Sequence, residues 1–255
     1  MNKRVKLALV VCLLMAMFST APRPAAAETS SRLSPYWGTT ITQWDDLIVR
    51  YSGQRGIDPD LIASIIFEES HGFPNQISFA GAVGLMQIMP QEAGFSWRPT
   101  RDELLLPATN LSWGTRTFSQ VMQQAEGSMS RALAAYNGGW GQVEYRGPKA
   151  FAGKVIDHYA RAIAARAGYD AKSMKAWSLV LDVRSSSGLA RIDLVRSDGT
   201  TEANAKFDLA RLPGSAPHAT VFSAIGKSNI AWFIEAWVIV EPAEGRTINL
   251  ERGSY

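Results

Sequence analysis

Hydrophobic residues recur at helical spacing from residue 39 to about residue 168. In the first such segment, 39–56, they are Ile41, Trp44, Leu47, Ile48 and Tyr51. This spacing places the side chains on one face of an amphipathic helix, and the glycines that follow predict its end. Asp58 and Pro59 then predict the cap and the first turn of a second helix over 58–70. Further helices are predicted over 110–125, 129–137 and 150–168.

From Trp177 the pattern changes to that of β-strands. Segments 177–184 and 189–196 are rich in aliphatic and β-branched residues and flank the turn-forming sequence Ser-Ser-Ser-Gly. The segment 230–240 predicts a buried strand, because eleven residues that include Glu235 are too few to cross a membrane as a helix.

The two patterns together predict an α+β protein. We expect an all-helical domain over 28–170, followed by a small, mostly antiparallel β-rich domain over 171–255. The C-terminal unit could fold alone or pack on the helical part, and both alternatives stay open at this point.

The first 27 residues have the layout of a secretory signal. Basic residues at positions 3, 4 and 6 precede an apolar stretch over 7–18, and three alanines end the segment at Ala27. The apolar stretch is shorter than the ~20 residues that a spanning helix needs, so an uncleaved anchor is the less favoured alternative. We therefore expect an exported protein, periplasmic or associated with the cell envelope, with no membrane span after removal of the signal.

Composition narrows the function classes once this segment is set aside. The segment carries four of the 26 Lys and Arg residues and no acid, which leaves 22 basic against 23 acidic residues in the rest of the chain. A nearly neutral chain gives no reason to expect a nucleic-acid partner. The single cysteine, Cys12, lies inside the signal, and the three histidines have no metal-ligand spacing. We expect neither thiol catalysis, nor a metal, nor another cofactor.

Two adjacent carboxylates, Glu68 and Glu69, end the predicted helix over 58–70. At ~100° per residue, Glu69 lies in the middle of the apolar stripe and Glu68 at its edge. Burial disfavours a charged carboxylate and raises its pKa, so Glu69 is the better candidate for a general acid. The alternative is a pair of surface carboxylates at a helix end, which these residues alone do not exclude.

Motifs after this helix resemble the soluble lytic transglycosylase domain of glycoside hydrolase family 23. They are Glu69-Ser70, Ser78, the run Gly84-Leu85-Met86-Gln87-Ile88-Met89-Pro90, and Ala135-Tyr136-Asn137-Gly138-Gly139, in this order. The resemblance covers roughly residues 37–168 and does not extend to the C-terminal unit. It implies a lysozyme-like fold and cleavage of the β-1,4 bond between N-acetylmuramic acid and N-acetylglucosamine in peptidoglycan strands, leaving a 1,6-anhydromuramic end.

The same resemblance assigns roles by position. Glu69 corresponds to the single catalytic acid and base, and Tyr136 to a tyrosine that faces the catalytic carboxylate. Polar residues of the glycan groove are implied at Ser78 and Gln87. The motif's asparagine is Asn137, and Met86 is a candidate for the apolar groove wall.

A single carboxylate agrees with this chemistry, since glycosidases that use two carboxylates need them ~5 to 9.5 Å apart, one on each side of the bond. Adjacent Glu68 and Glu69 cannot flank one sugar. Two alternatives stay open: a lysozyme-type muramidase, in which water attacks, and a non-catalytic component that binds peptidoglycan.

The sequence after the Ala-Tyr-Asn motif departs from the family. Members often carry a Glu-Thr pair and then a tyrosine there, whereas this chain has Glu144 as the only nearby acid and Phe151 in place of the tyrosine. The substrate contacts on that side are therefore not implied by the resemblance. The role of the C-terminal unit is open as well: a wall-binding module, a contact surface for a cell-envelope or secretion assembly, or a stabilising appendage.

Overall fold

The structure is a computed structural model that describes residues 32–212, 216–224 and 232–240. The predicted export signal over 1–27 lies outside the described residues. Within them, no helix is long and apolar enough to cross a membrane.

Helices occupy the described chain up to Arg166. They are α2 (Thr39–Thr42), α3 (Asp45–Gly53), α4 (Pro59–Ser70), α5 (Arg101–Leu104), α6 (Pro107–Gln124), α7 (Met129–Gly138) and α8 (Arg146–Arg166), with short 3-10 turns at Gln91–Ala93 and Trp140–Gln142. The prediction of a single helix over 39–56 is wrong in one respect. The helix is interrupted at Gln43 and Trp44, which separate α2 from α3. The break lets the Trp44 indole donate to the carbonyl of Gly72 at 2.9 Å.

The C-terminal part is an antiparallel sheet with strand order β3-β2-β1-β5-β4. Its strands are β1 (Trp177–Ser185), β2 (Ala190–Arg196), β3 (Thr201–Glu202), β4 (His218–Ala224) and β5 (Trp232–Val240). The α+β class is confirmed, with β1, β2 and β5 at the predicted segments. Strands β3, which has two residues, and β4 were not predicted.

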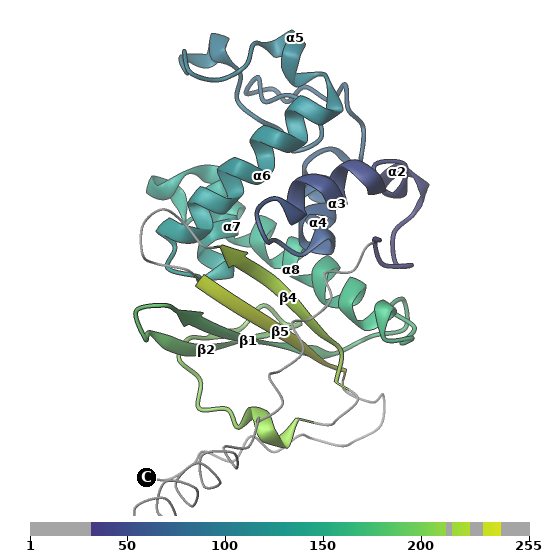
Figure 1. Ribbon diagram of the computed structural model, residues 1–255, viewed down its shortest axis with the longest axis vertical. Helices are drawn as coiled ribbons and strands as arrows, with labels where there is room; N and C mark the ends of the chain where they lie inside the picture. Colours follow the sequence, from purple (N-terminus) through teal and green to yellow (C-terminus); the bar gives the residue numbers. More distant parts are fainter. Residues whose placement is uncertain (1–31, 213–215, 225–231, 241–255) are drawn as a thin grey trace, which may run out of the picture.

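One face of the sheet packs against the helices. The C-terminal unit therefore packs on the helical part, which was the second of the two alternatives. Figure 1 shows α8 and the lower ends of α4 and α7 above the sheet. A single cluster of buried side chains runs from the helices into the inner sheet face, where it includes Leu181, Val183 and Ile234. Two hydrogen bonds cross the junction: the Asp58 amide donates to the Val221 carbonyl (2.8 Å), and the Trp177 indole donates to the Asp157 carboxylate (2.9 Å).

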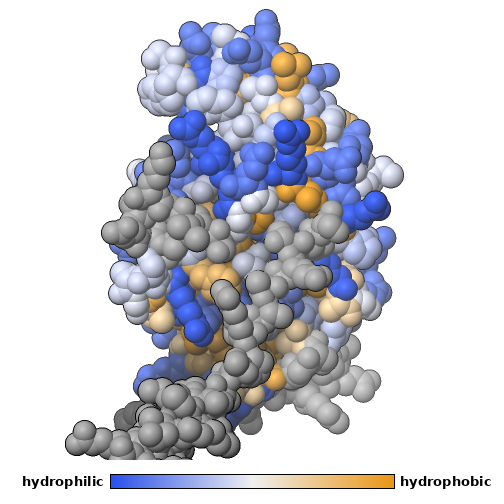
Figure 2. All heavy atoms as spheres, viewed as in Figure 1, coloured by the Kyte–Doolittle hydropathy of each residue, from blue (hydrophilic) through white to orange (hydrophobic). Residues whose placement is uncertain are grey.

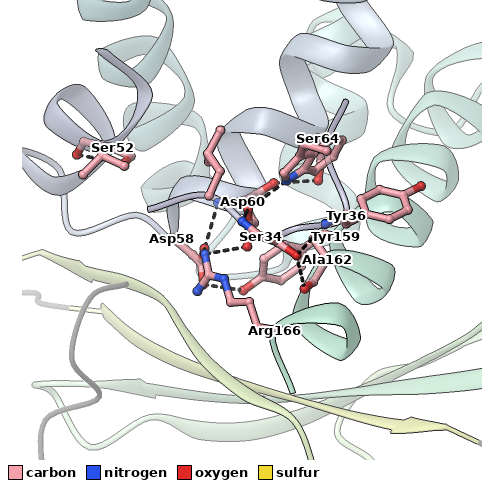
Figure 3. Close-up of polar contacts among 12 residues, drawn as sticks. Ser34, Tyr36, Ser52, Asp58, Asp60, Ser64, Tyr159, Ala162 and Arg166 are labelled. Atoms are coloured by element: carbon pink, nitrogen blue, oxygen red, sulfur yellow. Dashed lines mark hydrogen bonds and ion pairs between the residues drawn. The ribbon is translucent and has the colours of Figure 1, made fainter. Parts of the chain in front are cut away.

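A buried ionic cluster, defined by Asp58, Asp60 and Arg166, joins the start of α4 to the end of α8 (Figure 3). The Asp58 carboxylate also accepts from the Tyr159 hydroxyl (3.3 Å), and Asp60 accepts from the backbone amide of Ser34 (2.9 Å). Both carboxylates are almost wholly buried, with exposed fractions of 3% and 0%. Arg166 therefore supplies the positive charge that makes this burial tolerable.

Exposed hydrophobic side chains occur on the helical part and, in smaller number, on the C-terminal part, where they include Leu189 and Phe233. Figure 2 shows a narrow strip of them on the upper half of one face, between hydrophilic side chains. The large hydrophobic residues that are exposed near α4 and α5 are Phe73, Ile77, Phe79, Trp97 and Leu106. Most of them follow α4, so the exposed apolar surface lies on the segments next to its C-terminal end.

Candidate active site

Glu69 lies in the last turn of α4, the helix that runs through the centre of the helical part. The predicted start of this helix is confirmed: the Asp58 side chain accepts from the amide of Asp60 at 2.8 Å, and Pro59 occupies the first turn. The helix ends at His71, which adopts a left-handed conformation with φ of 53°. The Ser70 hydroxyl donates to the Leu85 carbonyl (2.8 Å) and ties this end to the following loop. The position of Glu69 is therefore held on both sides.

The two adjacent carboxylates have opposite electrostatic environments. Burial and, to a smaller extent, the negative charge of Glu68 raise the pKa of Glu69 to about 8, against the opposing effect of a hydrogen bond from Asn137. In contrast, the pKa of Glu68 lies below its ordinary value, chiefly because His158 donates to it, with Lys154 adding a positive charge. Near neutral pH, Glu69 holds a proton and Glu68 is charged. Divergent pKa values in a carboxylate pair are typical of acid–base catalysis.

Glu68 is held by two residues of α8. His158 Nε2 donates to Glu68 Oε1 at 3.1 Å, and Lys154 Nζ lies 3.4 Å from Glu68 Oε2. The other ring nitrogen of His158 lies 2.7 Å from the Tyr36 hydroxyl, which fixes the plane of the imidazole. Glu68 is thus turned toward α8 and away from Glu69, in agreement with its place at the edge of the apolar stripe.

The structure brings Tyr136 and Asn137, at the end of α7, next to Glu69. The Tyr136 hydroxyl donates to the Met86 carbonyl at 2.8 Å, and its ring contacts Phe118 edge-on at 5.8 Å. Burial raises the pKa of Tyr136 well above its ordinary value, and the nearby Glu69 carboxylate raises it further. Tyr136 therefore remains a neutral phenol, while the more exposed Asn137 bonds the Glu69 side chain directly.

Ser78 and Gln87 lie on the loop between α4 and α5, and both are half-buried. The Ser78 hydroxyl accepts from the amide of Ala82 (3.0 Å), which leaves its own hydrogen available as a donor. The Gln87 side-chain nitrogen donates to the carbonyls of Gln76 (3.0 Å) and Gly84 (2.9 Å). Both hydrogens of this amide group are used, so Gln87 can offer a ligand only its carbonyl oxygen.

Met86 does not line a groove, and this corrects the sequence analysis. Its side chain has an exposed fraction of 0% and packs against the Cα of Gly114 on α6. The backbone of Met86, not its side chain, contacts the site and positions Tyr136. Its amide donates to Asn110 Oδ1 (2.8 Å), and its carbonyl accepts from the Tyr136 hydroxyl. The spacing of the motif could not separate a groove wall from a core position, since methionine serves both.

Gly114→Ala is expected to destabilise the protein by about 1–3 kcal/mol, because a Cβ at this position would overlap the Met86 side chain. The measurement is urea unfolding of both proteins at equal pH. Gly153→Ala on α8 is the matched control, since a Cβ there meets nothing within 4 Å. If the Gly153 variant were as unstable as the Gly114 variant, the loss of stability would come from replacing any helical glycine and not from the contact with Met86.

Three polar groups near the carboxylates have no signal in the sequence. His158 and Lys154 lie on α8, about 90 residues from Glu68 in the chain, so no local pattern connects them. Arg98 lies close enough to Tyr136 for each to influence the other's pKa, and its guanidinium donates to the Met89 carbonyl at 3.2 Å. In the described residues, no group of three or more His, Cys, Asp or Glu side chains could hold a metal ion.

The arrangement can donate a proton from Glu69 and take it back. It provides one protonated, largely buried carboxylic acid, a neutral amide and phenol beside it, and polar groups on the loop over 71–90. A second free carboxylate is not offered by Glu68, which His158 and Lys154 engage. The chemistry that fits is therefore acid–base catalysis by one group.

Part of the chain is similar to known proteins. Residues 46–155 match the profile of the Transglycosylase SLT domain. Membrane-bound lytic murein transglycosylase E of Buchnera aphidicola is 38% identical over 93 residues, which are 33% of this chain and 42% of the relative. The transglycosylase of Enterobacteria phage PRD1 is 33% identical over 115 residues, 45% of this chain and 42% of the relative.

Endo-type membrane-bound lytic murein transglycosylase A of Klebsiella pneumoniae is 39% identical over 99 residues, 34% of this chain and 49% of the relative. The chain thus spans less than half the length of these relatives. Among solved structures, the 70 kDa soluble lytic transglycosylase of Escherichia coli is 25% identical, with a TM-score of 0.42 over 49% of this chain and 25% of that one. Residues 46–155 of this chain are therefore similar to the Transglycosylase SLT domain, and the sequence relatives are named as transglycosylases.

Proposed function

We propose that this protein is an exported lytic transglycosylase that cleaves the β-1,4 bond between N-acetylmuramic acid and N-acetylglucosamine in peptidoglycan and forms a 1,6-anhydromuramic end. The observation that carries the proposal is the largely buried Glu69, hydrogen-bonded by Asn137, in the segment that matches the Transglycosylase SLT domain. The relatives are named murein transglycosylases, and murein is peptidoglycan.

In the proposed reaction, Glu69 is first an acid and then a base. Its proton passes to the glycosidic oxygen as the bond to C1 of the muramic sugar breaks, and the N-acetyl group of that sugar stabilises the positive centre. The Glu69 carboxylate then takes the proton of the C6 hydroxyl while the C6 oxygen bonds to C1. The proton balance closes without a second carboxylate, which fits the engagement of Glu68 by α8.

The neighbouring residues take supporting roles in this proposal. Asn137 orients the Glu69 side chain through their hydrogen bond, and Tyr136 packs beside the carboxylate as a neutral phenol. Ser78 can donate a hydrogen bond to the glycan, and Gln87 can accept one, because their other polar atoms are used within the loop.

Product analysis tests the proposal against its alternatives. Residues 28–255 are incubated with purified peptidoglycan, and the soluble muropeptides are identified by mass spectrometry. Anhydro ends, lighter than reducing ends by one water, are the expected result. Reducing ends would assign the protein as a lysozyme-type muramidase, and binding without any product would assign it as a peptidoglycan-binding component.

The pH profile should show a limb set by Glu69. Because the acid must be protonated to act, we expect kcat/KM to be constant just below the pKa of about 8 and to fall tenfold per pH unit above it. Initial rates of muropeptide release between pH 4 and 10 provide the measurement. A profile whose alkaline limb lies near pH 5, as for an ordinary glutamate, would contradict the protonated Glu69.

A further inference from the structure

A cleft of about 750 Å³ lies where the helical part meets the sheet; we call it the junction cleft. One wall comes from the start of α7 and the first half of α8, and the other from β2 and the turn after it, which includes Asp198. Its volume is in the range of ligand sites in proteins, ~300–1,000 Å³. The wall formed by β2 lies outside the Transglycosylase SLT domain, which ends at residue 155.

The junction cleft has charges of both signs. Its basic residues include Arg131, Lys149 and Arg196, and its acidic residues include Glu144, Asp193 and Asp198. The Glu144–Lys149 pair is 2.7 Å apart, with exposed side-chain fractions of 79% and 57%. Such an exposed pair contributes little stability, so either partner can exchange for a charged group of a ligand. The lining therefore fits a ligand that has both carboxylate and ammonium groups.

Arg131 is the residue most available to a carboxylate. Its guanidinium lies against the face of Trp140, 5.8 Å from guanidinium to ring centre, and its positive charge helps to lower the pKa of the Glu144 carboxyl. A contact of this kind with a ring face does not take up the hydrogen-bond donors of the guanidinium. An arginine in this state can bind a carboxylate through two parallel hydrogen bonds.

The two helices of the junction cleft also reach the candidate active site. On α8, Lys154 and His158 line the cleft and bind Glu68. On α7, Ala134 lines the cleft, and Asn137 lies three residues later, less than the ~5.4 Å of one helical turn, and bonds Glu69. A chain leaving a sugar bound at Glu69 could therefore enter the cleft directly.

We propose that the junction cleft binds the peptide stem of the peptidoglycan strand cut at Glu69. This inference rests on the proposed function, because it places the reacting muramic sugar at Glu69. The stem is attached to that sugar, and it is a short peptide with several carboxylates and a side-chain amine. Arg131 and Arg196 bind stem carboxylates, and Asp198 and Glu144 face the amine.

The test compares two substrates: intact peptidoglycan, and the same glycan after enzymatic removal of the stems. Arg131→Glu and Arg196→Glu are each expected to lower kcat/KM on the intact substrate about tenfold and to leave the rate on the stem-free glycan unchanged. Arg50→Glu, on the exposed surface of α3, is the matched control and should change neither rate. Activity on the stem-free glycan also shows that each variant is folded.

Binding of the free stem supplies a readout that does not require turnover. Calorimetric titration of Glu69→Gln with a synthetic stem tetrapeptide should show binding that Arg131→Glu weakens about tenfold. Equal losses on both substrates, or no peptide binding, would overturn the inference while leaving the proposed function intact. Peptide binding without product from any glycan would overturn the proposed function, and the cleft would remain a peptide site.

Discussion

Glu69→Gln is expected to abolish release of muropeptides, with a loss of at least about 10³-fold. The amide has the size of the carboxylic acid but cannot donate a proton to the leaving oxygen or take one from the C6 hydroxyl. General acid–base catalysis typically contributes ~10²–10⁴-fold, and here one group serves both steps. The measurement is the initial rate on purified peptidoglycan, with anhydro products counted by mass spectrometry.

The fold should survive this change and become less sensitive to pH. The pKa of Glu69 is about 8 in the folded protein and lies near 4.5 in the unfolded chain, so the folded state binds the extra proton between these values. Stability contributed by the protonated form is complete below the unfolded pKa and is lost as pH rises to about 8. Urea unfolding of Glu69→Gln should lack this decline.

Glu68→Gln is the matched control. Removing the charge of Glu68 takes away one cause of the raised pKa of Glu69, so the alkaline limb of activity should move to lower pH while turnover persists. If Glu68→Gln abolished activity and Glu69→Gln retained it, the roles of the two carboxylates would be reversed. Full activity of Glu69→Gln would remove the assignment altogether.

Arg166→Met is expected to destabilise the protein by about 3–5 kcal/mol at neutral pH. The change leaves Asp58 and Asp60 buried without their positive partner, and an unpaired buried charge is far more costly than the pair is favourable. Urea unfolding at pH 7 provides the measurement. Arg116→Met, on the exposed side of α6, should change stability by less than about 0.5 kcal/mol.

The pH dependence identifies the cause of this loss. Burial already raises the pKa of Asp60 to about 6 in spite of Arg166, and it raises the pKa of Asp58 as well. Without the arginine both values rise further, so the folded variant binds extra protons up to a higher pH. Acidification from pH 8 to pH 5 should therefore restore part of the lost stability. A loss that is equal at both pH values would assign the effect to packing instead.

Local sequence patterns were sufficient to predict those helices and strands whose conformation depends on residues close together in the chain. The Asp58-Pro59 start of α4 and the apolar stripe that contains Glu69 follow from capping chemistry and helical periodicity. Strands β1, β2 and β5 follow from β-branched runs between turn signals. Strand β4 was not predicted, because its polar and small residues are also typical of a loop. Only the folded chain shows that Val221 and Phe222 are buried in the core.

The sequence by itself determined the longer helices, strands β1, β2 and β5, the position of Glu69 on the buried side of its helix, and the family motifs around it. Only the tertiary structure decided the state of the two carboxylates, because His158 and Lys154 reach Glu68 from a distant helix. It also decided that Met86 is core, that the sheet packs on the helices, and that the junction cleft exists. Periodicity is a local property of the chain, whereas burial and charge depend on residues that only folding brings together.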